Sequence, residues 1–295
     1  MSNKLINFSL ISLTAYSVYK LITNRVFNYA FKKNEIPDKV SDDLKKWIEK
    51  SKKEKVHIIS DDNLNLNGIL FKNNKTKNYI ICVHGIWSSK DFMYPYVYEL
   101  DKLGYNILLI DQRASGDSDG EYYTYGYRES MDLAKWCDFL ASKIKNIKIC
   151  LFGVSMGAAT CMMSTSRNLN KSVKCIIEDC GYSSLYEQFE HMLKNKYKIK
   201  NTKLVLSIFD NVINKKMGFK LDDVNLKRCL NTNKIPILLI HGEKDNFVPF
   251  SMVNVLYESN LGEKQILKIK NAKHSGCIKD KKYFYTINLF IKKYL

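Results

Sequence analysis

The sequence predicts an α/β fold, in which helices cover both faces of a mostly parallel β-sheet. Short apolar runs of strand length alternate along the chain with longer segments of helical periodicity. This alternation is typical of parallel sheets, because parallel strands are joined by crossovers that are usually helical. A chain of 295 residues suits one domain with additions, since α/β folds of about 200–250 residues routinely form a single domain.

The expected strands follow from apolar runs, some alternating and some continuous. The second run alternates polar and apolar residues, whereas the third is continuously apolar, as in a strand buried on both faces. Strands are expected at residues 56–60, 64–71, 78–83, 106–110, 147–152, 173–178, 235–240 and 264–270. Helices are expected at residues 91–103, 126–143, 156–167 and 251–259, and from residue 280 onward. Ligands of such a sheet bind at the carboxyl ends of its strands.

One interval interrupts this rhythm. Residues 183–233 contain no clear strand, and residues 204–217 carry a helical apolar stripe. We expect a helical lid inserted above the strand ends. An ordinary pair of packing helices is the alternative, and the two interpretations are compatible.

The N-terminal region, residues 1–30, is expected to be a membrane anchor. Residues 5–19 carry no charged side chain, and continued to Ile22 they approach the length of a spanning helix. Their polar residues do not gather on one helical face, which argues against a surface-lying amphipathic helix. A cleaved signal peptide and a docked N-terminal helix are the alternatives.

The expected anchor bears on the location of the rest of the chain and on its division into a linker and a domain. Basic residues are more numerous after the apolar segment than before it, which favours a cytoplasmic domain, whereas a cleaved signal would make the protein secreted or surface-exposed. Residues 31–55 are expected to be a linker with a short helix at 41–51 that begins at the N-cap Ser41. The domain is then expected to span residues 56–295.

The formal net charge of +17 raises the question of a polyanionic partner. Lysines are spread through the chain, and we find no helix-turn-helix, RNP-type or zinc-finger signature, so we expect a solvated basic surface and no nucleic-acid partner. The eight cysteines show no CxxC spacing, and several fall in expected strands. We therefore expect free, buried thiols, which favours a reducing compartment.

The sequence GVSMG places Ser155 where a strand becomes a helix. It fits the pattern G-x-S-x-G, in which a sharp and strained turn lifts the serine hydroxyl above the sheet. The flanking Gly153 and Gly157 leave room for that turn. A five-residue match is weak alone, but the apolar run before it and the small helix-compatible residues after it supply the expected context. Ser155 is therefore the candidate nucleophile.

A serine nucleophile requires a base and a carboxylate, and the order expected for this turn is Ser, then Asp or Glu, then His. Asp245 lies in HGEKDNFVP just after the strand at 235–240, and His274 lies in NAKHSG just after the strand at 264–270. Both therefore emerge at the sheet edge of Ser155. The remaining histidines lie in a strand, a loop motif, the expected lid and a strand end, namely His57, His84, His191 and His241.

Catalysis also requires hydrogen-bond donors for the oxyanion of the transition state. The residue after the nucleophile, Met156, is expected to supply one backbone N–H. The loop VHGIWSS follows the strand at 78–83 and supplies the other, which we assign to Ile86. Trp87 is the alternative for this donor.

These motifs resemble the α/β-hydrolase superfamily over about residues 55–295. The resemblance is carried by VHGIW, DQRASGDSDG, GVSMG, HGEKDNFVP and AKHSG. More narrowly, the chain is similar to bacterial membrane-anchored serine hydrolases grouped with prolyl-oligopeptidase-like and serine-aminopeptidase-like sequences. The resemblance implies an eight-stranded α/β-hydrolase fold, with Ser155 as nucleophile, Asp245 as carboxylate and His274 as base.

The chain departs from that group at one position. The group has D-x-R-G-x-G-x-S before its long helix, and Asp111, Arg113, Gly116 and Ser118 match, but Ala114 replaces the usual glycine. The departure bears on the conformation of this loop and not on the three candidate catalytic residues.

The sequence therefore predicts a serine hydrolase that cleaves an acyl compound, most simply a carboxylic ester, through an acyl-enzyme. A small peptidase, an amidase or a thioesterase of the same fold is the alternative within the enzyme class, and a non-catalytic binding protein is the alternative outside it. The expected substrate is a small acyl compound, and an anchor and an apolar lid would suit a lipid-like one. No cofactor is expected, and no metal, because histidines and cysteines lack ligand spacing.

Overall fold

A computed structural model describes residues 20–34, 39–72 and 75–295 of the chain. An eight-stranded sheet with the strand order β1-β2-β4-β3-β5-β6-β7-β8 forms its centre. The strands are β1 (Lys53–Ile59), β2 (Asn65–Phe71), β3 (Asn78–Val83), β4 (Asn106–Ile110), β5 (Lys148–Val154), β6 (Val173–Asp179), β7 (Ile237–Gly242) and β8 (Lys264–Ile269). Only β2 runs against both of its neighbours, and the remaining pairs are parallel. The α/β fold that the sequence predicts is confirmed.

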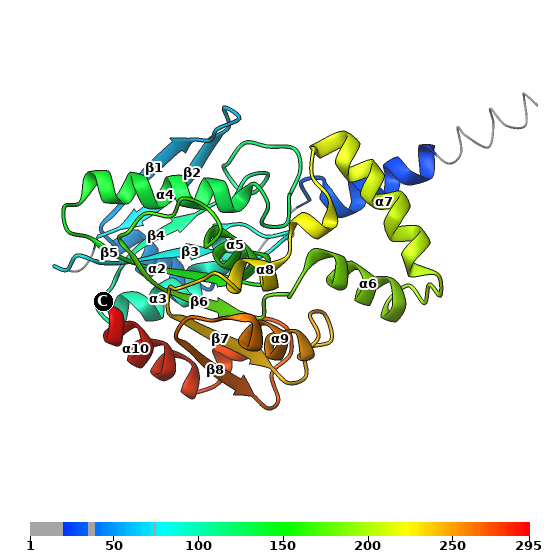
Figure 1. The fold of residues 1–295 in the computed structure, drawn as a ribbon. Helices are drawn as coiled ribbons and strands as arrows, with labels where there is room; N and C mark the ends of the chain where they lie inside the picture. The colour runs from blue at the N-terminus through cyan, green and yellow to red at the C-terminus, as the bar shows by residue number, and fades with distance from the viewer. Residues whose placement is uncertain (1–19, 35–38, 73–74) are drawn as a thin grey trace, which may run out of the picture.

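Helices cover both faces of the sheet (Figure 1). One face packs against α2 (Asp42–Lys50), α3 (Tyr94–Lys102) and α10 (Lys282–Tyr294). The other packs against α4 (Glu129–Lys143), α5 (Met156–Ser164), α8 (Leu226–Leu230) and α9 (Ser251–Ser259). Three short 3-10 turns lie at Lys90–Met93, Leu221–Asp223 and Cys277–Lys279.

Side-chain alternation explains the continuous apolar runs. In β3, Ile81 and Val83 face the core under α4 and α5, whereas Ile80 and Cys82 face the core under α3 and α10. Both faces of a central strand are buried, so every position favours an apolar residue.

The element ends differ from the sequence prediction for local reasons. The helix expected at 91–103 is divided into a 3-10 turn and α3, which has a proline in its first turn. That residue, Pro95, suits the start of a helix because it lacks the N–H that has no acceptor there. The helix expected at 126–143 begins at Glu129, since residues 124–128 form a turn that the Glu129 carboxylate holds through hydrogen bonds to Thr124 and Gly126.

The interval 183–233 is helical. It contains α6 (Leu185–Asn195), α7 (Thr202–Met217) and α8, and it joins β6 to β7. Ser184 and Asn201 cap the first turns of α6 and α7, and Gly218 ends α7 with a φ of 74°. In Figure 1, α6 and α7 project beyond the sheet and lie beside the N-terminal helix.

Residues 20–31 form that N-terminal helix. Phe27 and Phe31 are fully buried, and their rings stack with centroids 5.1 Å apart, because residues four positions apart lie on one helical face. Phe31 also contacts Phe189 of α6 and Phe209 of α7. The sequence predicts that these residues belong to an anchor and a linker, whereas here they pack against the inserted helices.

The apolar segment at residues 5–19 lies outside the described residues. Within the described ranges, the structure contains no helix long and apolar enough to cross a membrane. The anchor therefore stays a prediction from the sequence.

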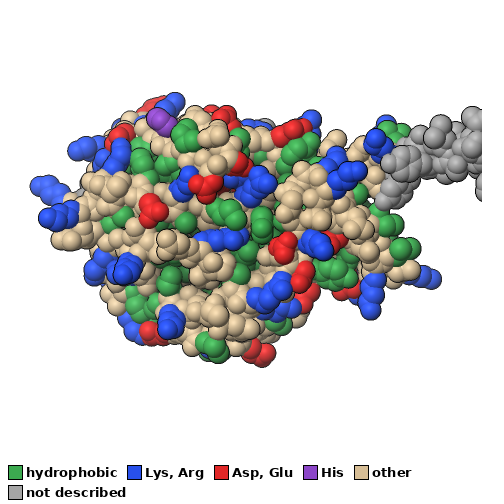
Figure 2. Space-filling view, turned by 45° about the horizontal axis from the view of Figure 1, so that its top comes forward, with side chains coloured by type: hydrophobic (Ala, Val, Ile, Leu, Met, Phe, Trp, Pro, Cys, Tyr) green, Lys and Arg blue, Asp and Glu red, His purple; other side chains and the backbone are tan. Residues whose placement is uncertain are grey.

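The surface and the cysteines agree with two expectations. On the face that Figure 2 shows, Lys and Arg side chains are spread over the surface and interspersed with Asp and Glu. Each of the eight cysteines is a buried free thiol, as predicted. The cysteine placement is thus that of small apolar core residues.

Candidate active site

Ser155 lies at the sharp turn between β5 and α5. Its φ of 57° and ψ of −118° are unfavourable for a residue with a side chain. The two glycines explain how the turn closes: a Cβ at Gly153 would overlap the backbone of Gly157, and a Cβ at Gly157 would overlap the carbonyl oxygen of Val83 in β3. A hydrogen bond from the Ser155 N–H to the Asp179 carbonyl, 2.8 Å long, ties the turn to β6.

The structure brings Ser155, His274 and Asp245 into one hydrogen-bonded row. His274 Nε2 lies 2.9 Å from Ser155 Oγ, and His274 Nδ1 lies 2.7 Å from Asp245 Oδ2. Because a carboxylate accepts hydrogen bonds, Nδ1 carries the proton and donates a hydrogen bond to Asp245. Nε2 is then free to accept the hydroxyl hydrogen of Ser155, which is the arrangement a general base requires.

Asp245 is held as a buried carboxylate. Its other oxygen, Oδ1, accepts hydrogen bonds of 2.9 Å from the backbone N–H groups of Phe247 and Val248. Burial opposes ionisation, but hydrogen bonds to His241, His274 and the Val248 N–H outweigh it and hold the pKa of Asp245 well below its usual value. The group is therefore ionised at neutral pH.

Further buried ionisable residues lie near this row, namely His241, Glu178 and Asp179. His241 Nε2 donates to the Val248 carbonyl at 3.0 Å and lies 3.4 Å from Asp245 Oδ2. Burial raises the pKa of Glu178 to about 8 and that of Asp179 to about 6. Asp179 also accepts a 2.6 Å hydrogen bond from the hydroxyl of Tyr283 in α10. His241 thus supports the Asp245 loop and does not contact Ser155.

The residues expected to supply the oxyanion donors lie around Ser155. Met156 is the first residue of α5, so its N–H has no acceptor within the helix. Ile86 and Trp87 both line the cavity at Ser155, and Trp87 has a φ of 58°. His84 fixes this loop, because its Nδ1 donates to the Gly85 carbonyl at 2.7 Å and its Nε2 accepts from the Gln112 N–H at 3.1 Å. The choice between Ile86 and Trp87 stays open.

The loop with the unusual alanine keeps the conformation that a glycine would adopt. Ala114 is buried with a φ of 56°. The neighbouring Asp111 carboxylate holds the loop by accepting from the Lys90 N–H at 2.7 Å and the Asp117 N–H at 3.0 Å. The loop tolerates a left-handed alanine, which costs about 1–2 kcal/mol.

A cavity of about 250 Å³ opens at the row, lined by Ser155, His274 and the loop that contains Ile86 and Trp87. Sequence reasoning missed two aromatic residues of its wall, Phe92 and Phe247. Phe247 packs on the His274 ring with centroids 4.8 Å apart. Its place two residues after Asp245 is the signal that could have indicated it.

One group of side chains has metal-ligand types within the described residues. Cys180, Asp245 and His274 offer ligand atoms within 4.8 Å of one another. Two of them are hydrogen-bonded to each other, and burial raises the pKa of the Cys180 thiol well above its usual value. These residues therefore do not fit a metal site, because a metal would require the thiolate and the Asp245 oxygen that His274 occupies.

Comparisons with known sequences bear on the fold. A family model described as the alpha/beta hydrolase fold matches residues 78–228. The uncharacterised protein YqkD of Bacillus subtilis is 28% identical over 201 residues, covering 68% of this chain and 66% of the relative. The uncharacterised protein YfhR of Escherichia coli is 22% identical over 204 residues, covering 68% and 64%. The match thus spans just under two thirds of the length of these relatives.

Solved structures show the same fold. The esterase Pf2001 of Pyrococcus furiosus superposes with a TM-score of 0.70 and 25% identity over 90% of this chain and 99% of that one. Acetyl xylan esterase 1 of a Thermoanaerobacterium species superposes with a TM-score of 0.59 and 14% identity, covering 90% and 96%. Since the family model covers just over half of the sequence and the topology agrees, this chain belongs to the alpha/beta hydrolase fold family.

Proposed function

We propose that the protein is a serine hydrolase that cleaves a carboxylic ester through an acyl-enzyme on Ser155. The observation that carries the proposal is the row of hydrogen bonds from Ser155 Oγ through His274 to a buried, ionised Asp245. Two structural neighbours, Pf2001 and acetyl xylan esterase 1, are esterases, which supports the ester over other acyl compounds.

The first half-reaction forms the acyl-enzyme. Ser155 Oγ attacks the carbonyl carbon while His274 Nε2 takes the hydroxyl proton, and Asp245 stabilises the imidazolium that results. The backbone N–H of Met156 and one from the loop at Ile86 and Trp87 stabilise the oxyanion. His274 then gives its proton to the alcohol oxygen as the carbon–oxygen bond breaks.

The second half-reaction restores the enzyme. A water molecule gives a proton to His274 Nε2 and attacks the acyl carbon. The bond to Ser155 Oγ breaks, and the proton returns to the serine. The products are a carboxylic acid and an alcohol, and the reaction needs no cofactor.

Labelling with a fluorophosphonate probe tests the proposal directly. The wild-type protein should be labelled, and Ser155→Ala and His274→Ala should each lose labelling and ester turnover. Ser207→Ala and His57→Ala are matched controls, since both side chains are exposed and neither lines the cavity at Ser155. Labelling that survives Ser155→Ala would contradict the assignment of the nucleophile.

Amide and thioester substrates with the same acyl group separate the alternatives. We expect esters to be cleaved faster than the matching amides, because an alkoxide leaves more readily than an amine. Faster cleavage of the amide would favour a peptidase or amidase. Absence of fluorophosphonate labelling in a folded wild-type sample would favour a binding protein without catalytic activity.

A further inference from the structure

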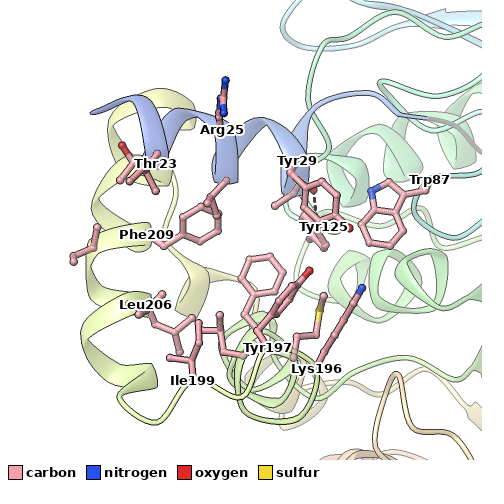
Figure 3. A pocket seen from close by; sticks show the side chains of 18 residues that line it. Thr23, Arg25, Tyr29, Trp87, Tyr125, Lys196, Tyr197, Ile199, Leu206 and Phe209 are labelled. Carbon is pink, nitrogen blue, oxygen red and sulfur yellow. Dashed lines mark hydrogen bonds between the residues drawn. The ribbon is translucent and has the colours of Figure 1, made fainter. Parts of the chain in front are cut away.

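A second, larger cavity lies away from the catalytic row. Its volume is about 730 Å³, and it is enclosed by the helix of residues 20–31, α6 and α7. This size lies within the range of about 300–1,000 Å³ that is typical of ligand pockets. Figure 3 shows Tyr29 above the cavity, Leu206 and Phe209 at its side, and Tyr197 and Ile199 below.

The lining is almost entirely aliphatic and aromatic. Arg25, one of its two charged lining residues, points away from the cavity in Figure 3. Along one edge, Ile22 and Val26 are 55% and 49% exposed, so apolar side chains reach the solvent there. A site of this kind binds hydrocarbon, because it offers burial of apolar surface and few polar partners.

A third, small cavity shares lining residues with both the large cavity and the cavity at Ser155, and we call it the neck. The neck, of about 20 Å³, is lined by Ser155 and Met156 at one end. Trp87, Tyr125, Phe189 and Met192 line both the neck and the large cavity. Passage of an acyl chain requires the side chains shared by the two cavities to move, and the unbranched thioether of the half-buried Met192 suits such a movement.

The position of His274 decides which part of a substrate lies on which side. His274 lines the 250 Å³ cavity together with Ser275, whereas the described residues that line the neck and the large cavity do not include it. The leaving alcohol must lie next to His274 to receive its proton. The acyl group then extends the other way, past Met156 and into the neck.

We infer that the large cavity binds the acyl chain of the substrate, which makes the preferred substrates esters of medium- and long-chain fatty acids. This inference rests on the proposed function. Each methylene buried in the cavity contributes up to about a fourfold increase in kcat/KM, the equivalent of its transfer from water. The helix of residues 20–31 and the inserted helices act together as the acyl-binding wall.

Two series of esters test the inference with the full-length protein. The first holds the 4-nitrophenol leaving group constant and lengthens the acyl chain from acetate through butanoate and octanoate to dodecanoate, below micelle-forming concentrations. We expect kcat/KM to rise by more than about tenfold along this series. The second holds acetate constant and lengthens the alcohol, and here we expect no comparable rise.

Variants of α7 locate the effect in the cavity. Val205→Trp fills the cavity, because Val205 lines it and is only half-buried, and Ile208→Trp does the same from the next turn. Both should abolish the rise with acyl length while leaving acetate cleavage and fluorophosphonate labelling intact. Ser207→Trp adds the same side chain at an exposed position of α7 that does not line the cavity, and it should keep the rise.

The outcomes separate the inference from the proposed function. Cleavage of short esters with no dependence on acyl length, or a dependence on the alcohol instead, would overturn the inference and leave the proposed function standing. Equal effects of Val205→Trp and Ser207→Trp would also overturn it. Absence of both labelling and ester cleavage would overturn the proposed function and this inference with it.

Discussion

At the residue scale, the chemistry depends on which hydrogen-bond partner each atom has. Asp245 uses one oxygen for two backbone N–H groups and the other for His274 and the nearby His241. His274 is thereby held with its unprotonated nitrogen 2.9 Å from Ser155 Oγ. The orientation of the base follows from the loop after β7, because that loop supplies both N–H groups.

Asp245→Asn tests this division of roles. The amide oxygen would take the N–H groups of Phe247 and Val248, so the NH₂ group would face His274 and force its proton onto Nε2. We expect kcat to fall about a thousandfold to ten-thousandfold, with little change in Tm. Ester hydrolysis and thermal unfolding are the measurements, with the exposed Asp61→Asn as control. A fall of less than about tenfold would contradict the role of Asp245.

The raised pKa of Glu178 predicts how the stability of the folded protein depends on pH. Burial raises its pKa to about 8 in the folded protein, above the value of about 4.5 that an unfolded chain shows. Between these values the folded state binds the proton that the unfolded state has lost, so the stability contributed by the protonated form is present below about pH 4.5 and is lost as pH rises to about 8. Glu178→Gln should therefore weaken the fall in Tm between about pH 5 and pH 8.

Thermal unfolding at a series of pH values measures this effect. The exposed Glu263 provides the control Glu263→Gln, which lacks the burial that raises a pKa. An unchanged slope of Tm against pH in Glu178→Gln would show that Glu178 is ionised in the folded protein.

Much of the candidate site can be predicted from the sequence. Ser155 follows β5 directly, Asp245 and His274 lie in the loops after β7 and β8, and strand ends of a parallel sheet meet at one edge. The roles of Phe247 and Glu178 cannot be derived in this way, since an aromatic residue in a loop and a carboxylate in a strand have many possible neighbours. Their positions depend on contacts between distant segments.

At the element scale, the turn between β5 and α5 depends on close contact between backbones. Gly157 lies where α5 crosses over β3, and a Cβ there would overlap the carbonyl oxygens of Val83 and His84. Helix and strand approach this closely because Gly157 has no side chain where it faces the backbone of Val83. The same approach positions the Met156 N–H beside Ser155.

Gly157→Ala should therefore separate α5 from β3. We expect a loss of stability of about 1–3 kcal/mol, as is typical of overpacked sites. Chemical denaturation measures the loss, and fluorophosphonate labelling of the remaining folded protein should also decrease because Met156 moves. Unchanged stability and labelling would show that the crossing has room to adjust.

The helix of residues 20–31 depends on its two buried phenylalanines. Phe31 contacts Phe27, Phe189 and Phe209, and all four belong to one core. Phe31→Ala should cost about 3–5 kcal/mol of docking energy. Hydrogen exchange should then show loss of protection in residues 20–31 while α4 keeps its protection, with the exposed Asn28→Ala as control. Unchanged protection would mean that Phe31 does not hold this helix.

The strands and most helices can be predicted because the buried positions of each element are apolar. They form a pattern that can be recognised within a short stretch of sequence. The docking of residues 20–31 cannot be predicted, since its partners Phe189 and Phe209 lie far along the chain. The spacing of Phe27 and Phe31 indicates an apolar helical face, but it does not indicate what covers that face. Local periodicity carries no information about a distant partner.

At the scale of the whole molecule, the acyl-binding wall and the expected anchor are contiguous in the chain. The anchor is expected in residues 1–30, with its apolar segment at residues 5–19, and the described helix of residues 20–31 that borders the large cavity follows that segment. A membrane-bound protein would therefore hold this cavity close to the bilayer. Lysines spread over the surface would add an attraction to anionic lipid that weakens with salt.

Flotation with liposomes separates these two modes of attachment. We expect the full-length protein to float with liposomes at both low and high salt, because insertion of an apolar segment is insensitive to screening. A variant that lacks residues 1–19 keeps the docking residues Phe27 and Phe31 and should not float at high salt. Flotation of that variant at high salt would contradict the anchor, and loss of full-length flotation with salt would indicate electrostatic attachment.

The eight buried thiols have a practical consequence. None reacts readily while the protein is folded, because each lies in the core and burial raises the pKa of Cys82 and Cys137, among others, above its ordinary value. A brief pulse of an alkylating reagent therefore marks only molecules, or parts of molecules, that have opened. Mass spectrometry would then identify which of the eight cysteines are alkylated first, and therefore which part of the fold opens first.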